Sequence, residues 1–191
     1  MKRLFILAAA LALPLGAQAV SMPGFCSRGI GADEARICAD PASTEAEGLV
    51  YALYRAALEQ RQGDDSKELQ ENHTKWWDGV KKCASSPAMS ACLNKAYAER
   101  ALYLQNTYKV TEATGPVAFS CSDGSKMQAT FLKTTPAAMV VQRGDQAMLL
   151  RGAPMASGIQ YRNRDHQFKE HQGKTTIEWG ANAKPASCTK S

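Results

Sequence analysis

Six cysteines in a chain of 191 residues constrain the fold more than any other feature of this sequence. They all follow an N-terminal segment with the three parts of a secretory signal: a basic start, an apolar run over residues 4–15 and the small-x-small cleavage pattern Ala17-Gln18-Ala19. The apolar run is too short to cross a membrane as a helix. We therefore expect cleavage after Ala19, a mature chain that begins at Val20, and a periplasmic or secreted protein.

The cysteines that remain after cleavage are Cys26, Cys38, Cys83, Cys92, Cys121 and Cys188. An even number of cysteines in an exported chain predicts disulfides, because the compartment is oxidising. The chain contains no CxxC pair, and its cysteine spacings do not match a zinc ribbon or finger, so we expect no bound metal. No cysteine stands where a lipoprotein signal requires one, and we therefore expect no membrane anchor.

The spacing of apolar residues divides the mature chain into two parts. In the first part they recur at intervals of three and four residues, which predicts helices. The first helix starts from an N-cap within residues 41–44 and stops at a break over residues 63–66, and two more run over residues 67–82 and 89–108. In the second part apolar and polar residues alternate, which predicts short strands. These strands lie near residues 126–131, 138–142, 146–150, 159–161, 167–169 and 175–179, with a hairpin turn at Arg143-Gly144-Asp145.

These patterns predict an α+β protein with two small domains. A disulfide-bonded helical domain occupies residues 20–110, a linker occupies residues 111–116, and a small antiparallel β-barrel occupies residues 117–191. The apolar content of 45% is ordinary for a globular protein and excludes a disordered chain. The net charge also differs between the parts: it is −2 over residues 20–114 and +5 over residues 115–191.

Three motifs of the second part resemble the MliC family of bacterial inhibitors of c-type lysozyme. Cys121 is followed by Asp123-Gly124, a loop carries Ser157-Gly158-Ile159-Gln160-Tyr161, and Cys188 lies near the C-terminus. In that family the motif serine and a later lysine hydrogen-bond the two catalytic carboxylates of the lysozyme. The resemblance therefore implies that the loop around Ser157 plugs the active-site cleft of a lysozyme, above all one of the c-type.

The family lysine has no direct counterpart in this chain. The family motif is an aromatic residue and then Thr-Lys-Gly, and placing Phe168 on the aromatic residue puts His171 at the lysine position. The resemblance thus implies Ser157 and His171 as the inhibitory pair. Lys169 and Lys174 flank His171 and are the cations that could replace the family lysine.

Two further residues of the serine motif have a structural interpretation as well as a functional one. Gly158 lets the backbone approach a partner closely, or simply forms a turn. Tyr161 either packs beneath the loop and fixes its shape or faces the barrel core. His166 and His171 lack a third ligand, so we do not expect them to form a metal site.

The first part of the mature chain resembles the cysteine-containing domain of LprI-type lysozyme inhibitors. The resemblance rests on the segment 34–41, on Trp76 and Cys83 at their spacing, and on the segment 92–100. It implies a small helical domain held by disulfides.

The cysteines of the first part allow three connectivities, and we expect the local pairs Cys26–Cys38 and Cys83–Cys92. In the barrel we expect the pair Cys121–Cys188, which joins the first strand to the last. A bridge between the two parts would contradict the division into two domains.

The two resemblances imply a proteinaceous lysozyme inhibitor. The alternative is a module on the same scaffold that binds cell-wall glycan or another exported protein and has lost lysozyme inhibition. We do not expect an enzyme, because the sequence shows no set of nucleophile, base and orienting group, no cysteine left free by pairing, and no HExxH motif. We expect no cofactor and no nucleic-acid partner.

Overall fold

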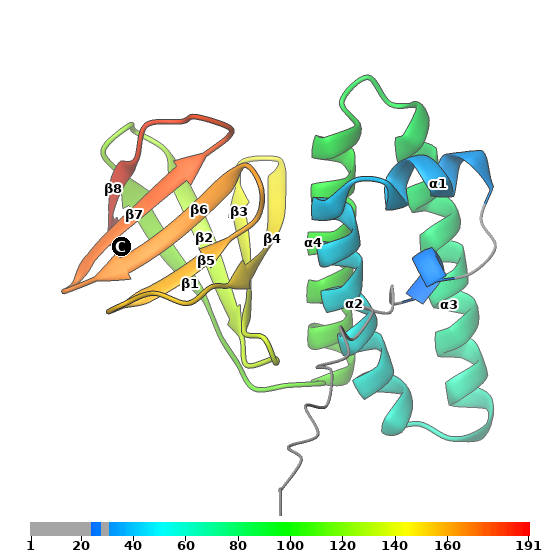
Figure 1. The fold of residues 1–191 in the computed structure, drawn as a ribbon. Helices are drawn as coiled ribbons and strands as arrows, with labels where there is room; N and C mark the ends of the chain where they lie inside the picture. The colour runs from blue at the N-terminus through cyan, green and yellow to red at the C-terminus, as the bar shows by residue number, and fades with distance from the viewer. Residues whose placement is uncertain (1–23, 28–30) are drawn as a thin grey trace, which may run out of the picture.

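The computed structural model of the chain describes residues 24–27 and 31–191, so the expected signal and its cleavage site lie outside the described residues. Within the described residues, helices come first and a closed antiparallel barrel follows (Figure 1). This confirms the predicted α+β fold, in which a disulfide-bonded helical part precedes a small barrel. No helix in these parts of the chain is long and apolar enough to span a membrane.

The helical part combines short and long helices. Their bounds are η1 Gly24–Ser27, α1 Ala32–Cys38, α2 Pro41–Glu59, α3 Gly63–Lys81, η2 Lys82–Ser85 and α4 Met89–Tyr108. Asp40 caps α2, since its carboxylate accepts the backbone N–H of Ser43 at 3.2 Å. The break expected at residues 63–66 is instead the first turn of α3, where Asp64 and Asp65 compensate the helix dipole.

Eight strands form the barrel within the described residues, each antiparallel to its neighbours. Their bounds are β1 Ala113–Cys121, β2 Lys126–Leu132, β3 Ala138–Arg143, β4 Gln146–Gly152, β5 Ile159–Arg162, β6 His166–His171, β7 Lys174–Trp179 and β8 Ala186–Lys190. β1 pairs with β8, with Cys121 opposite Cys188, and this pairing closes the barrel. The hairpin expected at residues 143–145 joins β3 to β4.

The connection between the helices and the barrel differs from the linker expected over residues 111–116. β1 already begins at Ala113, and Ala113 and Thr114 pair with residues of β2. Residues 113–116 of the expected linker therefore belong to the strand: Ala113 and Thr114 pair with β2, and a register shift before Val117 accommodates Gly115 and Pro116. Residues 109–112 alone separate α4 from the barrel.

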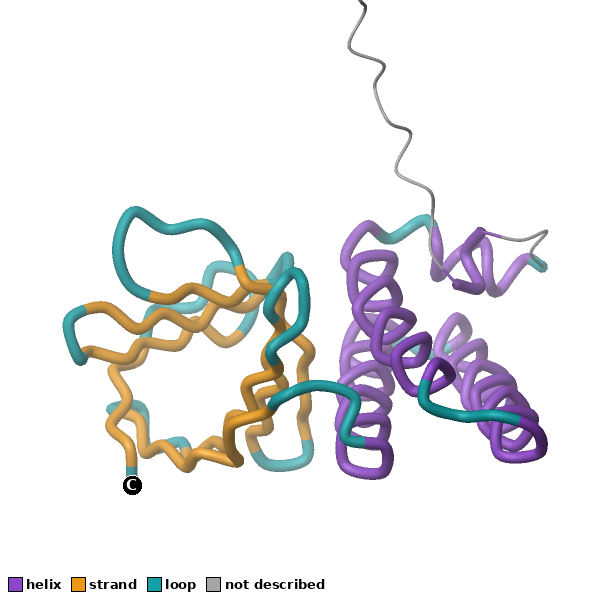
Figure 2. The backbone as a smooth tube through the Cα atoms, turned by 90° about the horizontal axis from the view of Figure 1, so that it is seen from below, coloured by secondary structure: helices purple, strands orange, loops and turns teal. Residues whose placement is uncertain are grey.

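β3 and β4 are buried on both faces. The residues that point into the barrel are Met139, Val141, Met148 and Leu150, and those that join the helical core are Ala138, Val140, Ala147 and Leu149. Burial on both faces explains why these strands are continuous apolar runs in the sequence. Figure 2 shows the helices against one side of the ring of strands, where α4 and α2 contact β4. The helices and the barrel therefore share a hydrophobic interface.

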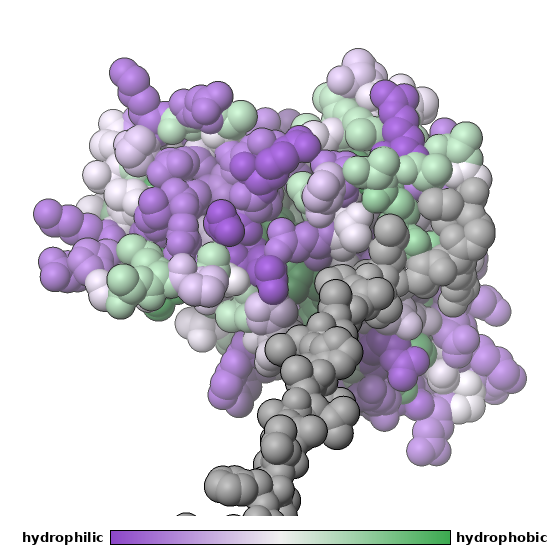
Figure 3. Space-filling view, in the orientation of Figure 1, coloured by the Kyte–Doolittle hydropathy of each residue, from purple (hydrophilic) through white to green (hydrophobic). Residues whose placement is uncertain are grey.

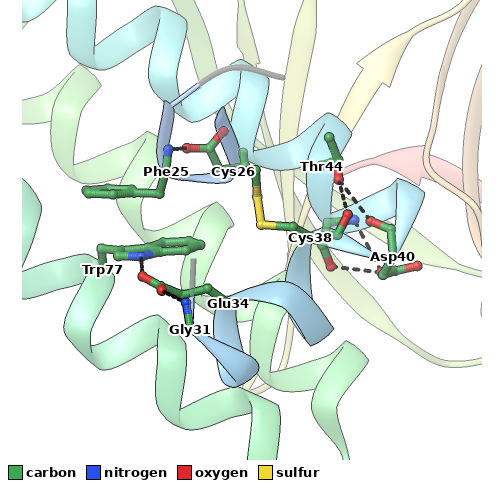
Figure 4. Close-up of a disulfide and its surroundings, with 10 residues drawn as sticks. Phe25, Cys26, Gly31, Glu34, Cys38, Asp40, Thr44 and Trp77 are labelled. Atoms are coloured by element: carbon green, nitrogen blue, oxygen red, sulfur yellow. Dashed lines mark hydrogen bonds between the residues drawn. A yellow bond between two sulfur atoms is a disulfide. The ribbon is translucent and has the colours of Figure 1, made fainter. Parts of the chain in front are cut away.

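All three expected disulfides form. They are Cys26–Cys38 between η1 and α1, Cys83–Cys92 between η2 and α4, and Cys121–Cys188 between β1 and β8. Near the first bridge, the rings of Phe25 and Trp77 stack with their centres 4.7 Å apart, and Trp77 donates its indole N–H to Glu34 at 3.0 Å (Figure 4). The bridge and the stacked rings together hold η1 and α1 against α3.

Glu47 of α2 carries a carboxyl group that is buried in the helical part. The residue is 1% exposed, Oε1 accepts the backbone N–H of Phe25 at 3.1 Å, and Oε2 has no hydrogen-bond partner among the described residues. Burial raises the pKa of Glu47 to about 7, against the lowering effect of the Phe25 hydrogen bond. Between the usual carboxyl pKa and this raised value the unfolded chain is ionised while the folded protein keeps the proton. Glu47 therefore destabilises the fold as the pH rises.

We predict that Glu47→Gln removes this pH dependence. In the wild type, ionisation of Glu47 should lower the free energy of unfolding by about 3 kcal/mol between about pH 4 and pH 8. Glutamine still accepts the Phe25 N–H but carries no charge, so the variant should be more stable than the wild type near pH 8. Urea unfolding at both pH values measures the difference.

Glu59→Gln, at the exposed end of the same helix, is the matched control for this experiment and should behave like the wild type. A Glu47→Gln variant whose stability falls with pH as steeply as that of the wild type would contradict the assignment to Glu47.

Candidate functional site

Two turns lie together at one end of the barrel. Residues 153–158 join β4 to β5, and residues 172–173 join β6 to β7. Ile159 at the start of β5 pairs with Glu170 near the end of β6, so the first turn lies beside the second. The serine motif and the segment aligned with the family lysine therefore meet in space.

Ser157 and His171 are in direct contact across these turns. The hydroxyl Oγ of Ser157 lies 3.0 Å from Nδ1 of His171, and the same nitrogen lies 3.3 Å from the backbone carbonyl oxygen of Ser157. Ser157 is exposed and His171 is half-buried. The structure thus brings together the two residues that the resemblance implied as a pair.

The contact with the carbonyl oxygen favours the tautomer of His171 that carries a proton on Nδ1, since a carbonyl oxygen can only accept. In that form Nδ1–H donates to Ser157, and the hydroxyl hydrogen of Ser157 is free to be donated elsewhere. Protonation of the ring adds a proton at Nε2 and gives His171 a second donor. The pair can therefore present two hydrogen-bond donors, one of them cationic, to an acceptor outside the barrel.

Gly158 holds the serine turn against β6. Its φ is +90°, in the region that favours glycine, and a Cβ atom at this position would collide with the backbone carbonyl oxygen of Glu170. Any other residue must move the turn away from β6. This close approach keeps Ser157 within reach of His171.

The other expected site residues lie in different places. Tyr161 is 9% exposed and packs on aromatic rings inside the barrel, so it anchors β5. Lys169 lies within β6, where its Nζ is 3.9 Å from a carboxylate oxygen of Glu178. Lys174 is exposed and pairs with His171 across the second turn. Lys174 is therefore the flanking lysine that lies directly beside the pair.

The two histidines of β6 cannot share a metal ion. His166 begins the strand and His171 ends it, and at about 3.3 Å per residue they lie roughly 16 Å apart. Nor does any other part of the described chain gather three or more His, Cys, Asp or Glu side chains that could hold a metal ion.

Two exposed apolar side chains lie on either side of Ser157 in the sequence. Met155 is 39% exposed and Ile159 is 49% exposed, and among the described residues only Tyr103 joins them as a large exposed apolar side chain. The sequence analysis did not single out Met155 or Ile159 as site residues. Apolar residues on both sides of a Ser-Gly turn that fit neither a helical nor a strand period are, however, a sequence signal of a contact surface. In Figure 3 hydrophilic residues cover most of the visible face of the barrel, with a small hydrophobic area near its lower left edge. Apolar side chains exposed together at a projecting turn are typical of a contact surface.

Comparison with known proteins assigns the barrel to a family. Residues 119–185 match the family MliC, described as membrane-bound lysozyme-inhibitor of c-type lysozyme, and the matched segment includes both turns. No curated protein and no solved structure matches the chain. The family match does not extend to the helical part, so the resemblance of that part to LprI-type inhibitors stays a prediction. Residues 119–185 of the barrel therefore match the MliC domain.

Proposed function

We propose that this protein inhibits c-type lysozyme by inserting the turn around Ser157 into the active-site cleft of the enzyme. The observation that carries the proposal is the contact between Ser157 and His171 at an exposed end of an MliC domain. The family description supports a c-type lysozyme as the partner. The protein then acts as an inhibitor in the periplasm or outside the cell, and not as an enzyme.

The two parts of the chain have different proposed roles. Within the helical domain, residues 20–110, the helices α2 and α4 pack on the outer face of β3 and β4 and support the barrel from the side. The barrel domain, residues 117–191, carries both turns. Ser157, Gly158 and both residues of the second turn are exposed, so the end of the barrel that carries Ser157 is open to a partner.

The donors of the pair suit the catalytic centre of a c-type lysozyme. That centre has two carboxyl groups across a cleft, one protonated and one ionised. The oxygen of Ser157 accepts Nδ1–H of His171 while its hydroxyl hydrogen is donated to a carboxylate, and protonated His171 donates Nε2–H to the same group or its neighbour. Hydrogen bonds to an ionised group are roughly twice as strong as neutral ones.

The apolar residues beside the turn add affinity and exclude water. Met155 and Ile159 can bury their exposed surface against the walls of the cleft, at about 25 cal/mol for each Å² removed from water. Exclusion of water also strengthens the hydrogen bonds of Ser157 and His171, because the local dielectric constant falls.

We predict that Ser157→Ala weakens inhibition by about 10- to 150-fold. The loss of one hydrogen bond to a charged group costs about 1.5–3 kcal/mol. The inhibition constant against a purified c-type lysozyme in a turbidity assay measures the effect. Ser187→Ala, at an exposed serine of β8, is the matched control and should leave the constant unchanged. A Ser157→Ala variant as potent as the wild type would show that the turn does not enter the cleft.

We predict that His171→Ala weakens binding to lysozyme by about tenfold, because the variant loses a hydrogen-bond donor beside Ser157. His171→Lys places a cationic donor at the position aligned with the family lysine and should bind at least as tightly as the wild type.

Calorimetric titration of lysozyme with each variant measures the dissociation constants. A His171→Ala variant that binds as tightly as the wild type would remove His171 from the site and leave Ser157 without a cationic companion.

We predict that Gly158→Ala weakens inhibition at least tenfold while the barrel stays folded. The new Cβ forces the turn away from Glu170 and separates Ser157 from His171. Gly144→Ala is the matched control: Gly144 also has a positive φ, of 61°, but nothing lies within 4 Å of the position of a Cβ atom there. Both variants carry backbone strain, so a similar inhibition constant for the two would mean that the close approach to β6 is unimportant.

The alternative function is a module that binds glycan or another exported protein without inhibiting lysozyme. Purified mature protein that leaves the rate of c-, g- and i-type lysozymes unchanged, at concentrations well above that of the enzyme, would favour this alternative.

A further inference from the structure

A hollow of about 550 Å³ lies at the other end of the barrel, between the start of α4 and the β3–β4 hairpin. Its polar and aromatic lining comes from both parts of the chain and includes Asn94, Lys95, Asp145, Gln146, His166 and Trp179. Its apolar lining includes Ala91 and Met148. The volume falls within the range of small-molecule sites.

The hollow is separate from the Ser157 site. β6 runs from His166, which lines the hollow, to His171, which contacts Ser157, and this length of strand spans roughly 16 Å. β7 likewise runs from Lys174 at the turns to Trp179 at the hollow. The two sites therefore occupy opposite ends of the same strands.

Trp179 is held rigidly at the hollow. Its indole N–H donates to Oε1 of Gln146 at 2.8 Å, the guanidinium of Arg143 lies 5.4 Å from the ring centre, and the ring of His166 meets it edge-on at 5.4 Å. An aromatic ring fixed by three contacts loses little conformational freedom when a ligand stacks on it.

His166 presents a defined acceptor. Its Nδ1 lies 3.1 Å from Oδ1 of Asn163, and the same oxygen accepts the backbone N–H groups of Asp165 and His166 at 3.0 and 2.9 Å. An oxygen that accepts from these backbone groups is oriented as an acceptor, so Nδ1 carries the proton and Nε2 is the bare nitrogen. Burial lowers the pKa of His166, which keeps the ring neutral at neutral pH.

The charges of the hollow balance, since Lys95 is the one cation and Asp145 the one anion of its lining. A strongly charged ligand therefore gains no net attraction from these residues. The lining instead offers a rigid ring, a neutral acceptor, two amide side chains and a small apolar surface. This combination suits a ligand with many hydroxyl groups, one apolar face and a methyl group, which is the chemistry of an N-acetylated hexosamine.

We propose that this hollow binds N-acetylhexosamine units of a glycan, with a sugar ring against Trp179 and the acetamido methyl group near Ala91 and Met148. Because the hollow and the Ser157 turn lie at opposite ends of the barrel, one molecule can hold a glycan and a lysozyme at the same time. The glycan site does not depend on lysozyme inhibition, and either property can be absent without the other.

Calorimetric titration of the full mature protein, without lysozyme, tests the proposal. The probes are tri-N-acetylchitotriose, a wall fragment that contains N-acetylglucosamine and N-acetylmuramic acid, and cellotriose, which lacks acetamido groups. We expect saturable binding of at least one acetylated probe at millimolar or lower concentration and no binding of cellotriose. The neutral and the muramic-acid probes distinguish a plain glycan from a wall glycan as the ligand.

Three variants locate the site. Trp179→Ala and, independently, Asn94→Ala should each weaken binding at least several-fold, with about tenfold expected for Trp179→Ala. Trp179→Phe keeps a ring and should recover part of the affinity. Ser157→Ala is the matched control and should bind the sugars like the wild type.

The proposal is overturned if neither acetylated probe binds at millimolar concentration, or if binding survives in both Trp179→Ala and Asn94→Ala. Equal binding of cellotriose would refute the assignment to acetylated sugars. Displacement of the sugars by an acidic peptide that binds more tightly would assign the hollow to a protein partner instead.

Discussion

The pairing of β1 with β8 is the constraint on which the barrel depends. It joins strands whose cysteines, Cys121 and Cys188, are 67 positions apart, and the disulfide between them holds the closure covalently. In the chain-entropy view, a cross-link over a loop of this length contributes on the order of 4 kcal/mol. A closed barrel has no free edge, so every strand takes its register from two neighbours. The positions of the turns at both ends follow from that register.

Register then decides which side chains meet at each end of the barrel. At one end, the pairing of β5 with β6 places Ser157 against His171, and Gly158 permits the close approach. At the other end, His166 pairs with Trp179 across β6 and β7. The same few strands thus present hydrogen-bond donors with apolar neighbours at one end, and a fixed aromatic ring with polar groups at the other. The helices pack on the side of the barrel, at β3 and β4.

Much of the fold was predictable because the relevant signals are local. Alternation in β2 and paired cysteines near one another in the chain need no tertiary information. The wrong predictions, a helix break at residues 63–66 and a linker over residues 111–116, came from residue types that occur in more than one kind of local structure. Asp64 and Asp65 are common in turns but also favour the first turn of a helix, which is where they lie. Gly115-Pro116 suggested a linker, yet the register shift of β1 between Thr114 and Val117 accommodates both residues within the strand.

The candidate site was predictable only in part. The resemblance to a family pointed to Ser157 and His171, but their contact depends on the register of β5 on β6, which no local pattern reveals. The choice between Lys169 and Lys174 also required the structure, since Lys169 faces Glu178 on the side of the barrel and Lys174 faces the turn. The sequence left two interpretations of Tyr161 open, packing beneath the loop or facing the barrel core. The side chain is buried among aromatic rings inside the barrel, so Tyr161 positions β5.

The central claim is that Ser157 meets the catalytic carboxylates of lysozyme. A double-mutant cycle across the interface tests it most directly, with dissociation constants measured for wild type and Ser157→Ala against native lysozyme and against a lysozyme whose two catalytic carboxyl groups are changed to amides. The account predicts that the wild type binds the amide enzyme at least tenfold more weakly than native lysozyme. It also predicts that Ser157→Ala, which weakens binding to native lysozyme, changes the affinity for the amide enzyme little. Equal affinity of the wild type for both enzymes, or the same loss from Ser157→Ala with each, would contradict it.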